Sequence, residues 1–341
     1  MTVPPNQIAA ASRCPTGQLH GSDNSSSIFA ADRTFPTAVE LGSSSSSAPA
    51  PATTLQNRNT MNKSLNPGEP SGRWRTFGYV LLFWSGYALL LLGSGLLWGM
   101  MPRHWQQILL PPWQLMVFGP VMSLGAMILT VLLERREKIG LEEVGVALRQ
   151  RSPVRFMVGF LLGLILVALN FGIVSLTTGM RLMWAPEASL AATLITLVSF
   201  CVGACGEELG FRGYPLRRLE RACGFWSAQA MVAVAFAIYH LWVGVPWMNA
   251  LVGTGVGSLL FGMAAIASRG VALPIGLHAA WGFGGWTIGG KGFWKAVSQE
   301  GRSSDGGISI SYLAVAGLGI VAFWLWHQRN LKRKLITRKC R

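Results

Sequence analysis

The 341-residue sequence contains little charge: 13% of its residues are Asp, Glu, Lys or Arg, while 51% are hydrophobic. Soluble domains carry about 25% charged residues, so this composition argues against an ordinary soluble enzyme. Cysteine is also scarce, with five residues and no CxxC pair. Cys201 and Cys205 lie in an apolar run and are interpreted as small buried thiols rather than metal ligands or disulfide partners. The composition instead predicts several membrane-spanning helices.

Acidic residues are half as frequent as basic ones, with 14 Asp and Glu against 29 Lys and Arg and a net charge of +15. Such an excess can indicate a nucleic-acid-binding protein. Here, however, the basic residues stand in short segments between apolar runs, which is the pattern of membrane orientation signals. We therefore expect membrane lipids as partners and no nucleic acid.

Eight apolar runs are each long enough to cross a hydrocarbon core of about 30 Å. They are 77–101, 113–133, 155–178, 188–212, 225–243, 247–268, 271–290 and 308–327. The connecting segments on one side carry 22 Lys and Arg and those on the other side carry five. This bias predicts an integral multi-pass membrane protein with both termini in the cytoplasm. Short loops and 41 glycines favour a bacterial cytoplasmic membrane as its location.

The sequence divides into a polar N-terminal part and an apolar remainder. Residues 1–72 are polar and of low complexity, so they cannot bury a core and are predicted to be a disordered tail. Residues 73–341 are predicted to form an all-α, eight-span membrane domain. Segment 134–155 mixes basic residues with four glutamates and is predicted to be an interfacial amphipathic helix.

Ionisable residues within the apolar runs are few. The only acids there are Glu207 and Glu208, and the only histidines in the interior of a run are His240 and His278, since His327 is at the end of the last run. Such groups at membrane depth are costly and usually functional. Glu208 and Arg212 are four residues apart and can pair on one helix face, while Glu207 lies about 100° round the helix. An ordinary helix end with a salt bridge is the alternative interpretation of this stretch alone.

A helical hairpin would bring two of these residues to one depth. The turn at 223–224 joins the run that holds Glu207 to the run that holds His240, and both residues are equally far from it. Pro215 is expected to kink or interrupt the first arm. His278, in a later run, starts from the same side of the membrane at a slightly shallower depth.

The residues form three ordered motifs: Glu207-Glu208-x-x-Phe211-Arg212, Phe236-x-x-x-His240, and His278 in Pro-Ile-Gly-Leu-His-Ala-Ala-Trp. Over residues 150–290 the set resembles the CAAX-protease-like family of intramembrane proteases, also called Abi or CPBP. The resemblance implies a hydrolase with an all-α fold and a site that opens toward the cytoplasm. Its substrate would be a membrane-associated peptide or protein.

The resemblance also implies roles for individual residues. Glu207 would activate the attacking water, Glu208 and Arg212 would hold the site in shape, and His240 and His278 would complete it. Phe236 would support the second motif.

Two chemistries stay open at this site. In one, Glu207 is the general base and an imidazole N–H stabilises the oxyanion without a metal. In the other, Glu207, His240 and His278 bind a divalent metal such as Zn²⁺, as in metalloproteases, and Glu208 is the base. The sequence has no HExxH spacing that would require the second scheme, and the metal-free scheme is preferred.

Position 282 departs from the family pattern, because it is Gly where the third motif usually has Asn or Asp. This favours, as an alternative function, a catalytically silent membrane scaffold of the same family. If position 282 faces the cavity, Gly282→Asn is expected to raise activity. A proton-coupled transporter is a third hypothesis and is disfavoured, since no inverted repeat is visible.

Overall fold

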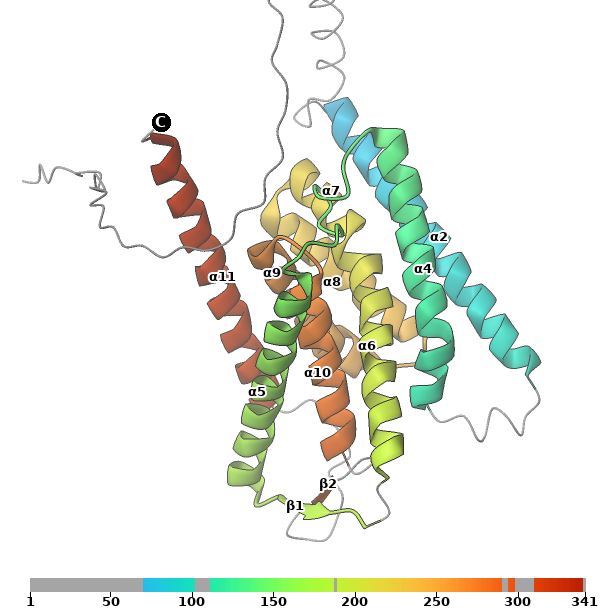
Figure 1. The fold of residues 1–341 in the computed structure, drawn as a ribbon, viewed down its shortest axis with the longest axis vertical. Helices are drawn as coiled ribbons and strands as arrows, with labels where there is room; N and C mark the ends of the chain where they lie inside the picture. The colour runs from blue at the N-terminus through green and yellow to red at the C-terminus, as the bar shows by residue number, and fades with distance from the viewer. Residues whose placement is uncertain (1–69, 102–110, 187–188, 290–293, 298–309, 340–341) are drawn as a thin grey trace, which may run out of the picture. The chain divides into compact units, whose positions relative to one another are not determined.

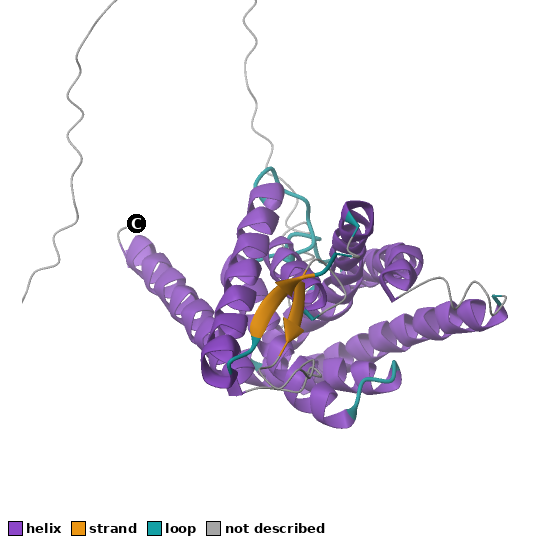
Figure 2. Cartoon of the chain, turned by 90° about the horizontal axis from the view of Figure 1, so that it is seen from below, coloured by secondary structure: helices purple, strands orange, loops and turns teal. Residues whose placement is uncertain are grey.

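The computed structural model describes residues 70–101, 111–186, 189–289, 294–297 and 310–339. Among these, the helices are α2 (Pro70–Met100), α4 (Pro111–Glu137), α5 (Ser152–Thr178), α6 (Leu190–Arg212), α7 (Tyr214–Cys223), α8 (Phe225–Trp242), the π-helix η1 (Asn249–Thr254), α9 (Gly255–Ser268), α10 (Ala272–Ile288) and α11 (Ile310–Lys339) (Figure 1). The only sheet in the described part is a two-stranded antiparallel ribbon of β1 (Arg181–Trp184) and β2 (Trp294–Val297) (Figure 2). The predicted all-α membrane bundle is therefore confirmed.

The predicted tail over residues 1–72 lies outside the described residues as far as residue 69. The described helices begin with α2 at Pro70 rather than at the predicted domain boundary of 73. Residues 64–333 form one compact unit, and the site lies within it.

Seven helical segments among the described residues are long and apolar enough to cross a membrane. They correspond to seven of the eight predicted runs. The remaining run, 271–290, forms α10, which has only 17 residues. By length the count is therefore seven rather than eight, because α10 is a short interior helix that packs against α5 and α6.

Glycines allow α10 to lie unusually close to α5. A Cβ atom at Gly276 of α10 would overlap the carbonyl oxygen of Phe156, and one at Gly159 of α5 would overlap that of Leu273. Small residues at such contacts are typical of helices that associate in membranes. This contact fixes the helix that carries His278.

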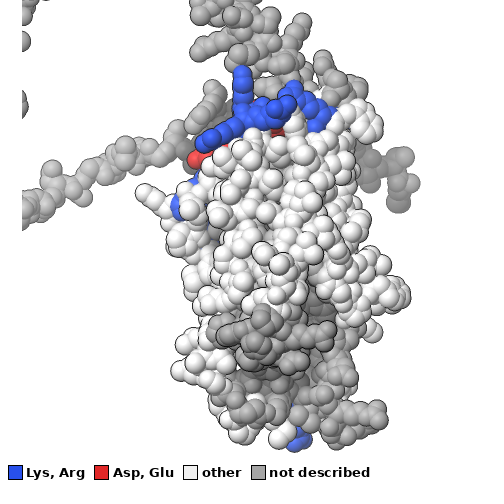
Figure 3. All heavy atoms as spheres, turned by 90° about the vertical axis from the view of Figure 1, so that its right-hand side faces the viewer, with Lys and Arg blue, Asp and Glu red and all other residues white. Residues whose placement is uncertain are grey.

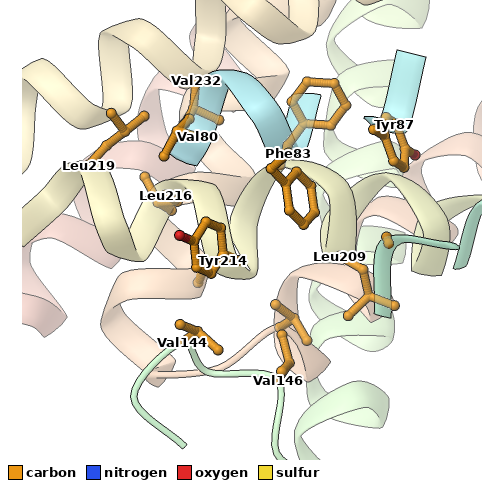
Figure 4. Close-up of a cluster of buried hydrophobic side chains, with 14 of the residues drawn as sticks. Val80, Phe83, Tyr87, Val144, Val146, Leu209, Tyr214, Leu216, Leu219 and Val232 are labelled. Carbon is orange, nitrogen blue, oxygen red and sulfur yellow. The ribbon is translucent and has the colours of Figure 1, made fainter. Parts of the chain in front are cut away.

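A hydrophobic cluster closes one end of the helices (Figure 4). Phe83 of α2 stacks on Tyr214 of α7, with ring centroids 5.6 Å apart, and Leu216 and Leu219 of α7 are completely buried beside them. Pro215 stands in the first turn of α7. The predicted interruption at this proline is thus a boundary between two helices, where Pro is tolerated because the first-turn N–H groups have no helical partner.

The segment between α4 and α5 is a loop, so the predicted interfacial helix over 134–155 is wrong. Lys138 and Gly145 have left-handed backbones, with φ of 55° and 76°, which break helical continuity. Val144 and Val146 are buried in the hydrophobic cluster. Residues 138–151, hereafter the 138–151 loop, therefore pack onto the protein through these two side chains.

Lys and Arg side chains gather at the same end of the helices (Figure 3). Two of them, Arg135 and Arg136, lie in the last turn of α4. Arg218 of α7 forms an ion pair with the buried carboxylate of Glu137. This end, where α4 ends and α5 and α10 begin, is called the basic end below. Its cytoplasmic location stays a prediction from the charge bias.

Candidate active site

Glu208 and Arg212 form a completely buried ion pair on α6. Nη1 of Arg212 donates to Oε1 of Glu208 at 3.1 Å, and both side chains are 0% exposed. Nη2 of Arg212 donates to the hydroxyl of Ser258 on α9 at 2.8 Å. The pairing predicted from helical spacing is present. Since each charge has lost its water, each depends on the other.

Aromatic rings surround the Arg212 guanidinium. Its carbon atom lies 4.2 Å from the ring centroid of Phe236, 5.6 Å from that of Phe261 and 5.9 Å from that of Phe211. Rings at these distances attract the cation through their quadrupoles. Three helices, α6, α8 and α9, thus hold the arginine, and through it Glu208, in one orientation.

His278 on α10 contacts both glutamates. Its Nδ1 lies 2.9 Å from Oε1 of Glu208, and its Nε2 lies 3.8 Å from Oε2 of Glu207. Because a carboxylate only accepts, Nδ1 carries the hydrogen of the first contact. The imidazole also stacks on Phe261, with centroids 4.4 Å apart. Glu208 therefore sets the tautomer of His278 and directs Nε2 toward Glu207.

Glu207 differs from its neighbour in access and in partners. Its side chain is 17% exposed, whereas that of Glu208 is 0% exposed. Oε2 of Glu207 is itself buried and has no hydrogen-bond partner among the described residues. The 3.8 Å to Nε2 of His278 is too long for a direct hydrogen bond. Glu207 thus presents a free acceptor next to a fixed imidazole.

His240 lies on the other side of Phe236. Its Nδ1 is 2.9 Å from the Phe236 carbonyl oxygen, so Nδ1–H donates to it and a neutral ring carries its lone pair on Nε2. The rings of His240 and His278 lie 4.4 Å and 6.2 Å from that of Phe236. Among the described contacts, His278 rather than His240 reaches a glutamate, although hairpin geometry placed His240 level with Glu207.

Position 282 faces a phenylalanine. A Cβ atom added at Gly282 would lie 2.5 Å from Cδ1 and 2.8 Å from Cε1 of Phe200. Gly282 is one turn beyond His278 on α10, and Phe200 is two turns before Glu207 on α6. The Phe200 ring therefore occupies the place into which a side chain at 282 would extend.

Three contributors to the site were not predicted. Ser258 and Phe261 of α9 bind Arg212 and stack on His278, respectively. Tyr87 of α2 donates its hydroxyl to the carbonyl of Gly206 at 3.0 Å, immediately before the glutamates. A polar residue within the apolar run 247–268 was the available signal for Ser258, but serine is common in spans and did not stand out.

The proposed zinc ligands do not come together in this structure. Among the described residues, no three His, Cys, Asp or Glu side chains are arranged to hold a metal ion. Nε2 of His278 lies near Glu207 and Nε2 of His240 keeps its lone pair, but His240 contacts neither glutamate among the described contacts. The side chains of Glu207, His240 and His278 are thus not arranged as a three-ligand site in the described structure, and no chemical step is assigned to a metal.

A comparison with protein-family models matches a segment in the second half of the chain. Residues 189–284 match the family model described as type II CAAX prenyl endopeptidase Rce1-like. No curated protein matches the chain. The matched segment contains α6 to α9, most of α10 and every predicted site residue from Glu207 to Gly282. The apolar helices and this match indicate an integral membrane protein, and residues 189–284 are similar to the type II CAAX prenyl endopeptidase Rce1-like family, which suggests an intramembrane CAAX-protease-type function.

Proposed function

We propose that the protein is an intramembrane endopeptidase that hydrolyses a membrane-associated peptide or protein with a water activated by Glu207. The observation that carries this proposal is the free carboxylate oxygen of Glu207, 3.8 Å from Nε2 of His278. A general base needs an available acceptor beside the water that it deprotonates. The carboxylate of Glu207, with the imidazole of His278 beside it, is such an acceptor.

The two glutamates have different roles in this mechanism. Glu208 is neutralised by Arg212 and engaged by His278 through Oε1. Its Oε2 also lacks a partner among the described residues, and its side chain is 0% exposed. The Glu207 side chain is 17% exposed, so it is the carboxylate of the pair that lies nearer to solvent. Glu208 therefore positions His278, and Glu207 performs the proton transfer.

The hydrolysis proceeds in two steps. The water donates a hydrogen to the carboxylate of Glu207 while its oxygen bonds to the carbonyl carbon of the scissile peptide. Glu207 takes the proton, and the carbonyl oxygen becomes an oxyanion. As the C–N bond breaks, Glu207 returns the proton to the leaving nitrogen, which gives a carboxyl group and an amine.

His240 is the oxyanion donor in this mechanism, and its tautomer restricts how it acts. Because Nδ1–H is given to the Phe236 carbonyl, the neutral ring offers only a lone pair at Nε2. A hydrogen bond from Nε2 to the oxyanion therefore requires the imidazolium form.

The test is cleavage by the purified full chain, in detergent, of a panel of lipidated and unlipidated membrane peptides. Glu207→Gln keeps the shape of the side chain but cannot accept the proton, so the rate should fall by roughly two or more orders of magnitude. Glu143→Gln, an equivalent change on the exposed 138–151 loop, should cleave at the wild-type rate. Wild-type cleavage by Glu207→Gln would refute the assignment of the base. Loss of activity on chelation, restored by Zn²⁺, would overturn the metal-free scheme.

A catalytically silent scaffold is the second candidate, and Gly282 with the Phe200 ring in its place is the observation that favours it. In that case the wild type cleaves no peptide of the panel. Retained cleavage by the wild type excludes it.

A further inference from the structure

A hollow lies at the basic end, and neither Glu207 nor His278 lines it. It has a volume of about 70 Å³. Three segments surround it: the 138–151 loop, the first turns of α5, and the turn from Arg269 to Ala272 that joins α9 to α10. The proposed hydrolysis uses no residue of this hollow.

The hollow carries unbalanced positive charge. Its ionisable lining residues are Arg149, Arg155, Arg269 and Glu142. Arg149 and Glu142 neutralise each other at 3.0 Å. Neither Arg155 nor Arg269 forms an ion pair with any carboxylate among the described residues. Two guanidinium groups thus line one small hollow without a counter-charge, which is a favourable arrangement for a phosphate group.

The walls of the hollow are fixed by the fold. Val144 and Val146 anchor the loop in the hydrophobic cluster, and the backbone N–H of Val271 donates to the Gly145 carbonyl at 3.1 Å. Arg269 has a left-handed backbone, with φ of 55°, where it ends α9. The loop and the α9–α10 turn are therefore joined to each other, and Arg269 is held at a defined place on the rim.

Apolar side chains continue from the hollow along the outside of α5. Leu148, which lines the hollow, is 94% exposed. Val158 and Leu162 of α5 stand three and seven residues after Arg155, on the same helix face, and they are 45% and 37% exposed. Exposed apolar side chains on a membrane-spanning helix contact lipid chains. A free phosphate ion would use only the arginines, whereas a phospholipid would use the arginines and this apolar strip.

We propose that the hollow binds the phosphate group of an anionic phospholipid, whose acyl chain lies along α5. Basic pockets between helices at the cytoplasmic surface bind anionic lipid head groups in this way. The bound lipid would connect α5, the 138–151 loop and the start of α10. Because α10 carries His278 and Val146 packs against Gly213, the residue after Arg212, the lipid would stabilise the fold around the site.

The test measures thermal unfolding of the purified full chain in detergent with added phosphatidylglycerol or phosphatidylcholine of identical acyl chains. At saturation, phosphatidylglycerol should raise the Tm of the wild type by roughly 5–10 °C more than phosphatidylcholine does. Arg155→Gln/Arg269→Gln should lose this difference. Arg329→Gln/Lys332→Gln is the matched control, because it removes two charges from the part of α11 that contacts the end of α9 through Asn330, and it should keep the difference.

Three results would overturn the proposal. The first is an equal phosphatidylglycerol shift in Arg155→Gln/Arg269→Gln and in wild type. The second is the same shift produced by inorganic phosphate without lipid, which would make the hollow a site for free anions. If the glutamine variant does not fold, Arg155→Lys/Arg269→Lys is measured instead, because it keeps both charges. This variant should retain at least half of the phosphatidylglycerol shift in Tm. The absence of any shift in it is the third contrary result.

Discussion

Replacement of Glu208 by glutamine should destabilise the protein more than any other single change of a carboxylate in the site. The variant Glu208→Gln keeps an oxygen that can accept from Nδ1 of His278 and from Nη1 of Arg212, which now lie at 2.9 Å and 3.1 Å from Oε1. What is lost is the negative charge. Arg212 is 0% exposed and has no other carboxylate within ion-pair distance among the described residues, so its charge would remain buried and uncompensated.

Breaking a buried ion pair by removal of one partner costs about 3–5 kcal/mol. The aromatic rings and Ser258 still contact the guanidinium and reduce the loss, so the lower half of that range is expected. At roughly 2–4 °C per kcal/mol for a chain of this size, the Tm should fall by about 6–16 °C. The measurement is thermal unfolding in detergent, followed by intrinsic tryptophan fluorescence.

Two controls separate the charge from other effects. Glu207→Gln changes a carboxylate that is 17% exposed and forms no ion pair with Arg212, so its Tm should stay within about 2 °C of wild type. Glu208→Gln/Arg212→Met removes both charges and should recover most of the lost stability, because apolar replacement of a buried ion pair is often neutral or stabilising. If Glu208→Gln melts at the wild-type temperature, or if the double variant is less stable than the single one, the buried charge is not what stabilises this site.

Three further predictions follow from particular residues. Gly282→Asn alone should lower both Tm and activity because the new side chain collides with Phe200. Gly282→Asn/Phe200→Ala should restore the stability. Equal Tm values for the two variants would show that the Phe200 ring moves aside freely. Gln229→Met should be neutral or stabilising by about 1–3 kcal/mol in thermal unfolding. The reason is that the Gln229 side chain is buried and that its amide nitrogen and oxygen both lack partners among the described residues. A clear loss of stability would reveal a required partner. Reporter fusions after residue 145 and after the C-terminus should score cytoplasmic and a fusion after residue 245 external, and the reverse pattern would invert the orientation predicted from the charge bias.

Local sequence patterns were sufficient for the membrane character and for one half of the site. Apolar runs long enough to cross a bilayer predict helices whatever their neighbours are. The pairing of Glu208 with Arg212 depends only on the helical repeat, so a spacing of four residues predicts it. Pro215 cannot continue a helix without loss of a hydrogen bond, and the boundary between α6 and α7 follows from that.

The other half of the site depends on how helices rotate and how closely they approach, which no local pattern records. Hairpin spacing placed His240 at the depth of Glu207, but depth does not decide which way an imidazole faces. The close glycine contact between α5 and α10 brings His278 to the glutamates, and Nδ1 of His240 is instead engaged by its own helix at Phe236.

Tertiary packing also decided what fills the space around the chemistry. Ser258 and Phe261 look like ordinary residues of an apolar run until α9 is placed against Arg212. In the sequence, Gly282 lacks the side chain that the family pattern has at this position. In the structure, the Phe200 ring occupies the space that such a side chain would need. The 138–151 loop has the charges of an interfacial helix, but burial of Val144 and Val146 removes apolar surface from water and stabilises the loop conformation. Contacts between residues far apart in the chain thus determined the site, since apolar side chains gain their specific partners only when the helices are packed.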